Sequence, residues 1–128
     1  LIMIPVTFVL RLIIFILFAS AGIGHFRTFD RFMSIMEGLP FAFLHPAAVW
    51  ITGVFELSLG IMVMLKPSPN VYHCLACLVL LMTPANINMW YRNLEFNGTR
   101  MSGKGHSLRG VAQIVLLYTL WHLGAAAA

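Results

Sequence analysis

The stretch PVTFVLRLIIFILFASAGIG, residues 5–24, decides the fold class, because its twenty residues carry a single charge, Arg11. At about 1.5 Å per residue, a helix of this length crosses the roughly 30 Å hydrocarbon core of a bilayer. Further apolar stretches follow at residues 44–65, 71–90 and 106–124. The sequence therefore predicts an all-α integral membrane protein, a four-helix bundle that forms a single domain over residues 1–124.

The composition supports the membrane interpretation. The chain is 60% hydrophobic and 9% charged, whereas a soluble domain has about 25% charged residues. The formal net charge of +4 is carried mostly by short loops, which indicates topology and contact with anionic lipid headgroups rather than nucleic-acid binding. The alanine tail at 125–128 carries no functional signal.

The first loop contains a second type of helix pattern. Apolar side chains recur at helical spacing between residues 29 and 36, and charged residues fall on the opposite side. This pattern predicts a short interfacial helix between spans one and two, with Thr28 as its N-cap and Gly38-Leu39-Pro40 as its end.

The loop charges predict the orientation. Four spans place both termini on one side of the membrane, where Lys66 is the only cation outside the spans. Loops one and three carry five cations: Arg27, Arg31, Arg92, Arg100 and Lys104. The positive-inside rule places these loops in the cytoplasm or in the matrix of an organelle. The mitochondrial inner membrane is favoured, with a bacterial inner membrane or another organellar membrane as alternatives.

Arg11 and Glu56 are charges inside predicted spans. Each ion at membrane depth costs at least about 2.5–3.5 kcal/mol. Arg11 lies about 9 Å from the start of span one and Glu56 about 13 Å from the end of the antiparallel span two. We therefore expect an Arg11–Glu56 pair or a protonated Glu56. Such a group either fixes helix register as a buried ion pair or carries protons or anchors a ligand.

A second polar group is expected at the opposite end of the bundle. His25 closes span one, Asn86 and Asn88 lie near the end of span three, and Arg109 and Gln113 open span four. Together they would suit a quinone carbonyl, a small anion or a lipid headgroup. The simpler interpretation is interhelical hydrogen bonding and snorkelling. It is favoured for Asn86 and Gln113, because the proline of span three frees a backbone carbonyl that needs donors nearby, whereas Asn88 is expected to face the headgroups.

Cys74 and Cys77 form a Cys-x-x-Cys motif within span three. Two thiols at this spacing share one helix face and are candidates for a redox pair, although apolar packing is the favoured role of cysteines in such a span. His73 would add a third metal ligand, but no fourth is evident, so no metal site is predicted. Motifs of soluble enzymes are absent from the sequence, and no catalytic residue is assigned.

The order of several short motifs resembles the DoxX-like membrane proteins. These motifs are Ala21-Gly22-Ile23-Gly24-His25-Phe26, Gly53-Val54-Phe55-Glu56 with Gly60, Pro84-Ala85-Asn86, and Arg109 with Gln113. The resemblance covers nearly the whole chain and implies a compact four-helix membrane bundle. It also implies an inward-facing polar set: Arg11, His25, Glu56, Asn86, Arg109 and Gln113. Some DoxX relatives are quinone-linked subunits of sulfur-compound oxidation, and others accompany redox or thiol-stress partners.

From size, the lack of a cofactor motif and this resemblance, we expect a small non-catalytic subunit of a larger membrane complex. A quinone-linked respiratory or other electron-transport assembly is the favoured complex. Its partners would be membrane lipids and other membrane subunits, with a quinone or a bound lipid as ligand and no resident cofactor. The alternative is a quinone- or thiol-linked oxidoreductase that uses Glu56 or His25 for protons and Cys74 with Cys77 for electrons. A proton or small-solute carrier, based on Glu56, is less favoured.

Overall fold

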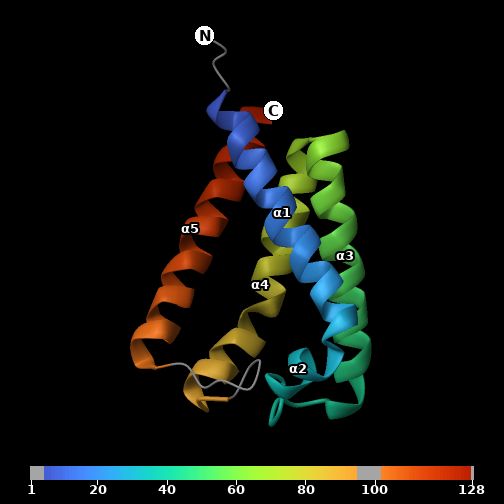
Figure 1. The fold of residues 1–128 in the computed structure, drawn as a ribbon, viewed down its shortest axis with the longest axis vertical. Coiled ribbons are helices and arrows are strands. Elements are labelled where there is room, and N and C mark those ends of the chain that lie inside the picture. The colour runs from blue at the N-terminus through green and yellow to red at the C-terminus, as the bar shows by residue number, and fades with distance from the viewer. Residues whose placement is uncertain (1–4, 95–101, 128) are drawn as a thin grey trace.

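The computed structural model describes residues 5–94 and 102–127, and this part of the chain contains helices and no strand. The long helices are α1 (Val6–Arg27), α3 (His45–Leu65), α4 (Pro69–Tyr91) and α5 (Gly103–Ala127) (Figure 1). All four are long and apolar enough to cross a membrane. The predicted all-α, four-span fold is confirmed, and α1 starts and α5 ends at the same end of the bundle.

Two helices extend beyond the predicted spans at the loop end. α1 continues to Arg27 rather than ending at residue 24, and α5 starts at Gly103 rather than at residue 106. The added turns are polar and are expected at the bilayer interface. The helices therefore continue beyond the apolar pattern from which they were predicted. α4 runs as one helix through Pro84, and the Ser68 hydroxyl caps its start by accepting from the Val71 N–H at 3.3 Å.

The expected short helix between spans one and two is present as α2 (Phe29–Ser34). Thr28 is its N-cap residue, as predicted, but the Thr28 hydroxyl makes no capping bond to α2 and donates instead to the Gly24 carbonyl at 2.8 Å. The same carbonyl accepts from the Thr28 N–H at 2.8 Å, so both donors of Thr28 bond to the end of α1. A short 3-10 helix, η1 (Ala42–Leu44), then leads into α3.

Asn88 ties this loop to α4. Its amide donates to the carbonyls of Ile35 at 2.9 Å and Glu37 at 2.8 Å, and the side chain is buried. The expectation that Asn88 faces the headgroups is therefore wrong. The loop folds back under the bundle, so its backbone carbonyls need hydrogen-bond donors. The Asn88 amide provides two such bonds.

α1 and α3 pack closely because glycines line their contact. A Cβ added to Gly22 would lie 2.7 Å from the Leu57 nitrogen, and one added to Gly53 would lie 2.7 Å from the His25 Cβ. Such distances leave no room for a side chain, so only glycine allows this approach. The close approach brings the last turn of α1 against the middle of α3.

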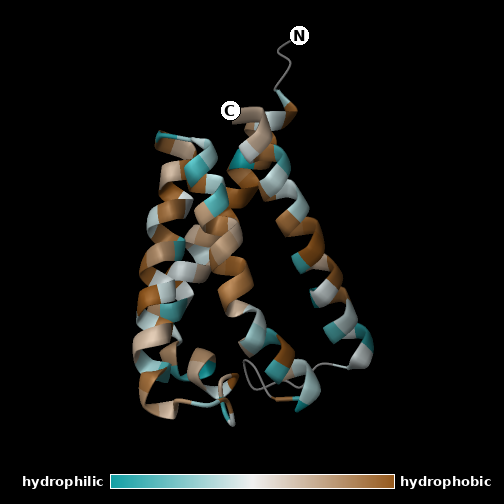
Figure 2. Ribbon diagram, turned by 180° about the vertical axis from the view of Figure 1, so that it is seen from behind, coloured by the Kyte–Doolittle hydropathy of each residue, from teal (hydrophilic) through white to brown (hydrophobic). Residues whose placement is uncertain are grey.

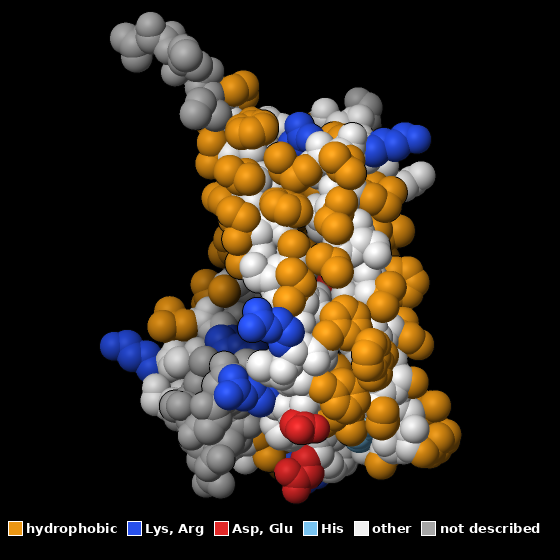
Figure 3. All heavy atoms as spheres, turned by 45° about the vertical axis from the view of Figure 1, so that its right-hand side comes forward, with side chains coloured by type: hydrophobic (Ala, Val, Ile, Leu, Met, Phe, Trp, Pro, Cys, Tyr) orange, Lys and Arg blue, Asp and Glu red, His pale blue; other side chains and the backbone are white. Residues whose placement is uncertain are grey.

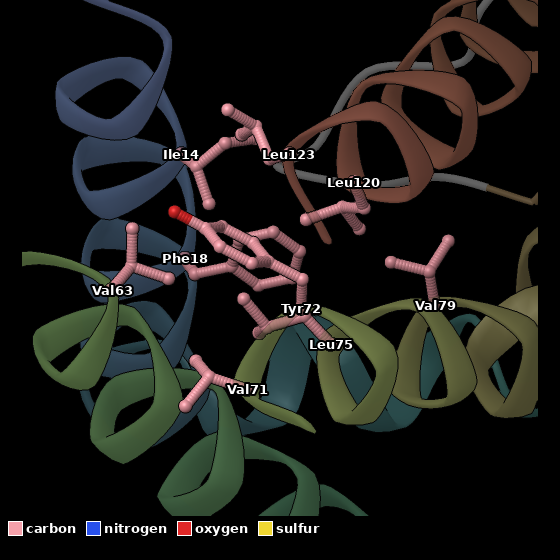
Figure 4. Close-up of a cluster of buried hydrophobic side chains, with 9 residues drawn as sticks. All are labelled: Ile14, Phe18, Val63, Val71, Tyr72, Leu75, Val79, Leu120 and Leu123. Carbon is pink, nitrogen blue, oxygen red and sulfur yellow. The ribbon is translucent and has the colours of Figure 1, made fainter. Parts of the chain in front are cut away.

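The four long helices meet at the end of the bundle that holds the termini. Figure 4 shows the cluster of buried apolar side chains formed there. Its members come from α1, α3, α4 and α5: Ile14, Phe18, Val63, Val71, Tyr72, Leu75, Val79, Leu120 and Leu123. Burial of these side chains closes this end of the bundle.

At the opposite end the helices separate. The lower part of α5 diverges from α1, while α2 and its loop lie below the end of α1 (Figure 1). Hydrophobic and hydrophilic segments along the helices are seen in Figure 2. Figure 3 shows an apolar belt on one face, with charged side chains towards both ends. This separation leaves the two hollows described below.

Candidate functional site

Arg11 does not contact Glu56, so the expected pair between these residues is wrong. Its guanidinium donates to the carbonyls of Val63 at 3.2 Å and Met64 at 3.0 Å. These carbonyls belong to the last turn of α3, where no helical N–H is available to them. Arg11 therefore caps the C-terminus of α3, where a cation is also favoured by the helix dipole.

The register of α1 against α3 explains the error. Gly53 lies beside His25 and Gly60 beside Phe18, so the first turns of α1 extend beyond the end of α3. The expected Arg11–Glu56 pair required that the start of α1 and the end of α3 lie at the same level. Because they are offset, Arg11 lies level with the end of α3 and Glu56 lies deeper.

Glu56 instead pairs with His25. Its Oε2 lies 3.1 Å from the His25 Nδ1, and the two residues are only 2% and 5% exposed. The same Nδ1 lies 2.7 Å from the Ala21 carbonyl, which competes for its proton. Oε2 is accordingly within ion-pair distance but forms no hydrogen bond in the part of the chain that the structure describes.

The ring of His25 is held in place from the loop. Phe32 of α2 stacks on it, with ring centroids 3.9 Å apart and an angle of 24° between the planes. The short interfacial helix thus has a direct structural role at this site. It covers the imidazole from the loop side while the carboxyl group contacts it from α3.

Glu56 and His25 line a cavity of about 260 Å³ between the α1–α3 pair and α4, which we call the Glu56 cavity. Its walls are mostly apolar and include Phe32, Ile35, Met36, Leu39, Val49 and Met82. Leu81 at its edge is 74% exposed, so the cavity reaches the lipid-facing surface. Its volume lies slightly below the roughly 300–1,000 Å³ of common ligand pockets, which suits a single ring or an equally small group.

A chain of hydrogen bonds joins α4 to α5. Arg109 donates to the Asn86 Oδ1 at 3.1 Å, and Asn86 donates to the Gln113 Oε1 at 3.2 Å. Gln113 donates to the Thr83 hydroxyl at 2.6 Å, which donates to the Val79 carbonyl at 3.0 Å. These residues thus form one network between two helices, separate from the Glu56–His25 pair.

The network lies along a second hollow, of about 190 Å³ between α4 and α5, which we call the Arg109 groove. His106 borders it at the loop end and bonds to the Asn93 Oδ1 at 3.1 Å. Asn86 lines both the groove and the Glu56 cavity. The five polar residues expected at this end do not share one pocket: His25 lines the Glu56 cavity, Arg109 and Gln113 line the groove, Asn86 lines both, and Asn88 bonds to loop carbonyls.

The family of the chain follows from the comparison with family models. The model described as "Methylamine utilisation protein MauE" matches residues 3–99, more than half of the sequence. This chain belongs to the MauE family. No curated protein and no solved structure matches it. The resemblance to DoxX-like proteins stays a prediction.

The MauE match covers one of the two hollows completely. All residues that line the Glu56 cavity lie between positions 21 and 86, within the matched range. Arg109 and Gln113 lie beyond it. Of the Glu56 cavity and the Arg109 groove, the family match thus includes the whole lining of the cavity alone.

The cysteines of this MauE-family protein lie on its outer face. Cys74 and Cys77 are free and exposed, and they line a shallow hollow together with His73. Among the described residues no group of three or more His, Cys, Asp or Glu side chains could hold a metal ion.

Sequence reasoning missed the residues that hold the polar set in place. Thr83 ends the network of α4 and α5, Met89 accepts from Arg109 at 2.9 Å, and Phe32 stacks on His25. Only Thr83 had a detectable signal, since it lies one helical turn before Asn86 and next to the proline of α4. The other two look like ordinary apolar residues in the sequence.

Proposed function

We propose that this MauE-family protein is a small non-catalytic membrane subunit of an electron-transport assembly, and that the Glu56 cavity binds a quinone ring. The observation that supports this most strongly is a buried carboxyl–imidazole pair in the wall of a mostly apolar cavity. Ionisable groups are costly inside a membrane, and their presence there indicates a functional role by default.

The chemistry of the pair suits a quinone carbonyl. With one proton shared between Glu56 and His25, the pair is either a neutral acid beside a neutral imidazole or an ion pair. In both states it carries a hydrogen-bond donor, which a carbonyl oxygen needs. The apolar walls would accept the ring, and the exposed edge at Leu81 would let a lipid-soluble ligand enter from the bilayer.

The role of an accessory subunit rests on size and surface. Four spans account for most of the described residues. Large apolar side chains cover α5, and several are more than half exposed: Leu108, Val111, Ile114, Val115, Tyr118 and Trp121. Such a surface fits lipid or another membrane subunit. The family is named for methylamine utilisation, and we extend to this chain only the role of a membrane component that serves such a metabolic system.

The finer localisation is part of the proposal. We place the loops after α1 and α4 on the cytoplasmic or matrix side, because four described cations lie at that end of the bundle: Arg27, Arg31, Arg92 and Lys104. The mitochondrial inner membrane remains the favoured compartment from the sequence. Protease protection of a tag placed after Ala127 would test the orientation, since the tag must lie on the opposite side.

Binding of a short-chain ubiquinone to the purified protein in nanodiscs tests the cavity. Glu56→Gln keeps the shape but changes the donor, so we expect a loss of affinity of about tenfold, equivalent to one hydrogen bond of about 1.4 kcal/mol. Ser58→Ala is the matched control, because Ser58 lies on the exposed side of the same helix. Equal affinity of wild type and Glu56→Gln would refute the quinone site.

The subunit role needs a separate experiment. Extraction in mild detergent, native electrophoresis and mass spectrometry should show this chain together with electron-transport subunits in a stoichiometric complex. A lone small species would refute the accessory role and leave the quinone result standing.

A second candidate function is a thiol-linked oxidoreductase, and one observation favours it. Cys74 and Cys77 are both free and lie on one exposed face of α4. The double substitution Cys74→Ser with Cys77→Ser should abolish a thiol-dependent activity of the complex. Unchanged activity would remove this candidate.

A further inference from the structure

We propose that the Arg109 groove is a binding site for a phosphate group, supplied by the headgroup of an anionic phospholipid. This inference is independent of the quinone site. It rests on the charge of Arg109, on the hydrogen bonds that orient it, and on the apolar side chains that lie deeper than Arg109 on α5.

Arg109 carries a charge that nothing described balances. Among residues 5–94 and 102–127, no carboxylate lies within ion-pair distance of its guanidinium. Its acceptors there are the Asn86 Oδ1 and the Met89 sulfur. A thioether is a weak acceptor, and a guanidinium has five N–H donors in a fork that matches phosphate oxygens. The remaining donors are therefore available for an anion.

The guanidinium is held in position before any ligand arrives. Its bond to Asn86 continues through Gln113 and Thr83 to the Val79 carbonyl, so each side chain in the series has a fixed partner. A fixed cation loses little side-chain freedom on binding, which favours affinity. Arg109 is half-buried between the helices, and the cost of that position is lowered by an anionic partner.

The depth of Arg109 suits a lipid phosphate. It lies six residues into α5, about 9 Å from the start of the helix at Gly103. A helix of 25 residues spans about 38 Å, so it projects about 4 Å beyond each side of a roughly 30 Å hydrocarbon core. Arg109 then lies just inside the hydrocarbon boundary, where a long cationic side chain reaches towards the phosphates.

The α5 wall of the groove becomes mostly apolar with depth, whereas on the α4 wall apolar Trp90 lies nearest the loop end and polar Thr83 lies deepest. His106 and Arg109 lie nearest the loop end, and Ile114 and Leu117 follow one and two turns deeper on α5. Ile87 of α4 lies on the other wall. A phospholipid has the same order of groups as the α5 wall, with its phosphate at the level of Arg109 and its acyl chains at the level of Ile114 and Leu117. A free phosphate ion would use only the polar end.

Native mass spectrometry of lipid retention tests the site. The purified full chain is exposed to a mixture of phosphatidylglycerol and phosphatidylcholine, and lipids that stay bound are identified. We expect preferential retention of phosphatidylglycerol by the wild type. Arg109→Gln should lower this preference about fivefold, the effect of one cation near anionic lipid.

Two variants control for folding and for general charge. Arg109→Lys keeps the charge and should keep most of the preference even if Arg109→Gln perturbs the network. Lys104→Gln removes an exposed cation from the first turn of the same helix and should leave the preference unchanged. An equal loss in Lys104→Gln and Arg109→Gln would overturn the site, because it would indicate a diffuse surface effect.

Inorganic phosphate distinguishes the two sources of the group. Millimolar phosphate should not displace bound phosphatidylglycerol from the wild type. Displacement that depends on Arg109 would keep the phosphate chemistry but overturn the assignment to lipid. Equal retention of both lipids by the wild type would overturn the proposal without any mutation.

Discussion

The contact between α1 and α3 predicts a specific effect of Gly22→Ala. The new Cβ would lie 2.7 Å from the Leu57 nitrogen and 2.8 Å from the Gly53 carbonyl oxygen. Both atoms belong to the backbone, so the helices themselves must move. Ordinary contact needs about 3.5 Å, which requires a local separation of about 0.7–0.8 Å. Overpacking of this size costs about 1–3 kcal/mol.

The same separation should weaken the Glu56–His25 contact. Their atoms are 3.1 Å apart, and a shift of the helices by this amount would stretch the contact to about 3.9 Å, close to the limit of about 4 Å for an ion pair. We therefore expect Gly22→Ala to lower both the stability of the bundle and the affinity of the Glu56 cavity for a quinone. The effect on the cavity arises without any change to its charged residues.

Gly24→Ala is the matched control for this prediction. It lies in the same helix, and its Cβ would be 3.6 Å from the Phe32 ring, an ordinary contact. Both substitutions gain the same helix propensity of about 0.8–1.0 kcal/mol, so the difference between the two variants isolates the packing cost. Reversible unfolding in mixed detergent–SDS micelles measures the free energies, and nitrogen NMR of His25 reports on its contact. Equal stability of Gly22→Ala and Gly24→Ala would refute the reasoning.

Three further changes test other contacts. Arg11→Met should lower the free energy of unfolding by about 1–3 kcal/mol, because it removes two charged hydrogen bonds to the end of α3; no change in SDS titration would contradict the capping role. Asn88→Leu should cost a similar amount of about 1–3 kcal/mol and speed proteolysis of residues 35–44, since it leaves two loop carbonyls without their donor; a cleavage rate equal to that of the wild type would contradict it. Cys74→Ser with Cys77→Ser should change stability by less than about 0.5 kcal/mol because both side chains are exposed, and a large loss would indicate a structural role.

The fold was predictable because it depends on segment length and hydrophobicity alone. A bilayer requires long apolar helices whatever their partners, and the four spans follow from that requirement. The helix ends were less predictable, since Arg27 and the start of α5 at Gly103 are polar and still helical. The apolar sequence pattern stops at the expected edge of the hydrocarbon core, whereas the helix continues until no further backbone hydrogen bond forms.

The pairing of the polar residues was not predictable, because it depends on register. Depth along a helix can be counted from the sequence, but the offset between two helices is set by where their small residues meet. Here Gly22, Gly53 and Gly60 set that offset, and it places Glu56 beside His25 rather than beside Arg11. The glycines themselves can be read in the sequence, but the residues that they contact cannot.

The position of the Glu56 cavity has a physical origin in side-chain size. At the end that holds the termini, large side chains such as Phe18, Tyr72 and Leu120 fill the space between the four helices. At the other end the cavity walls include the small residues Ala21 and Ala48, and α2 with its loop covers rather than fills the space. A bundle built in this way is rigid at one end and hollow at the other. A buried carboxyl group adjoining such a hollow is available to a ligand, whereas the same group within the filled end would serve only to fix the packing.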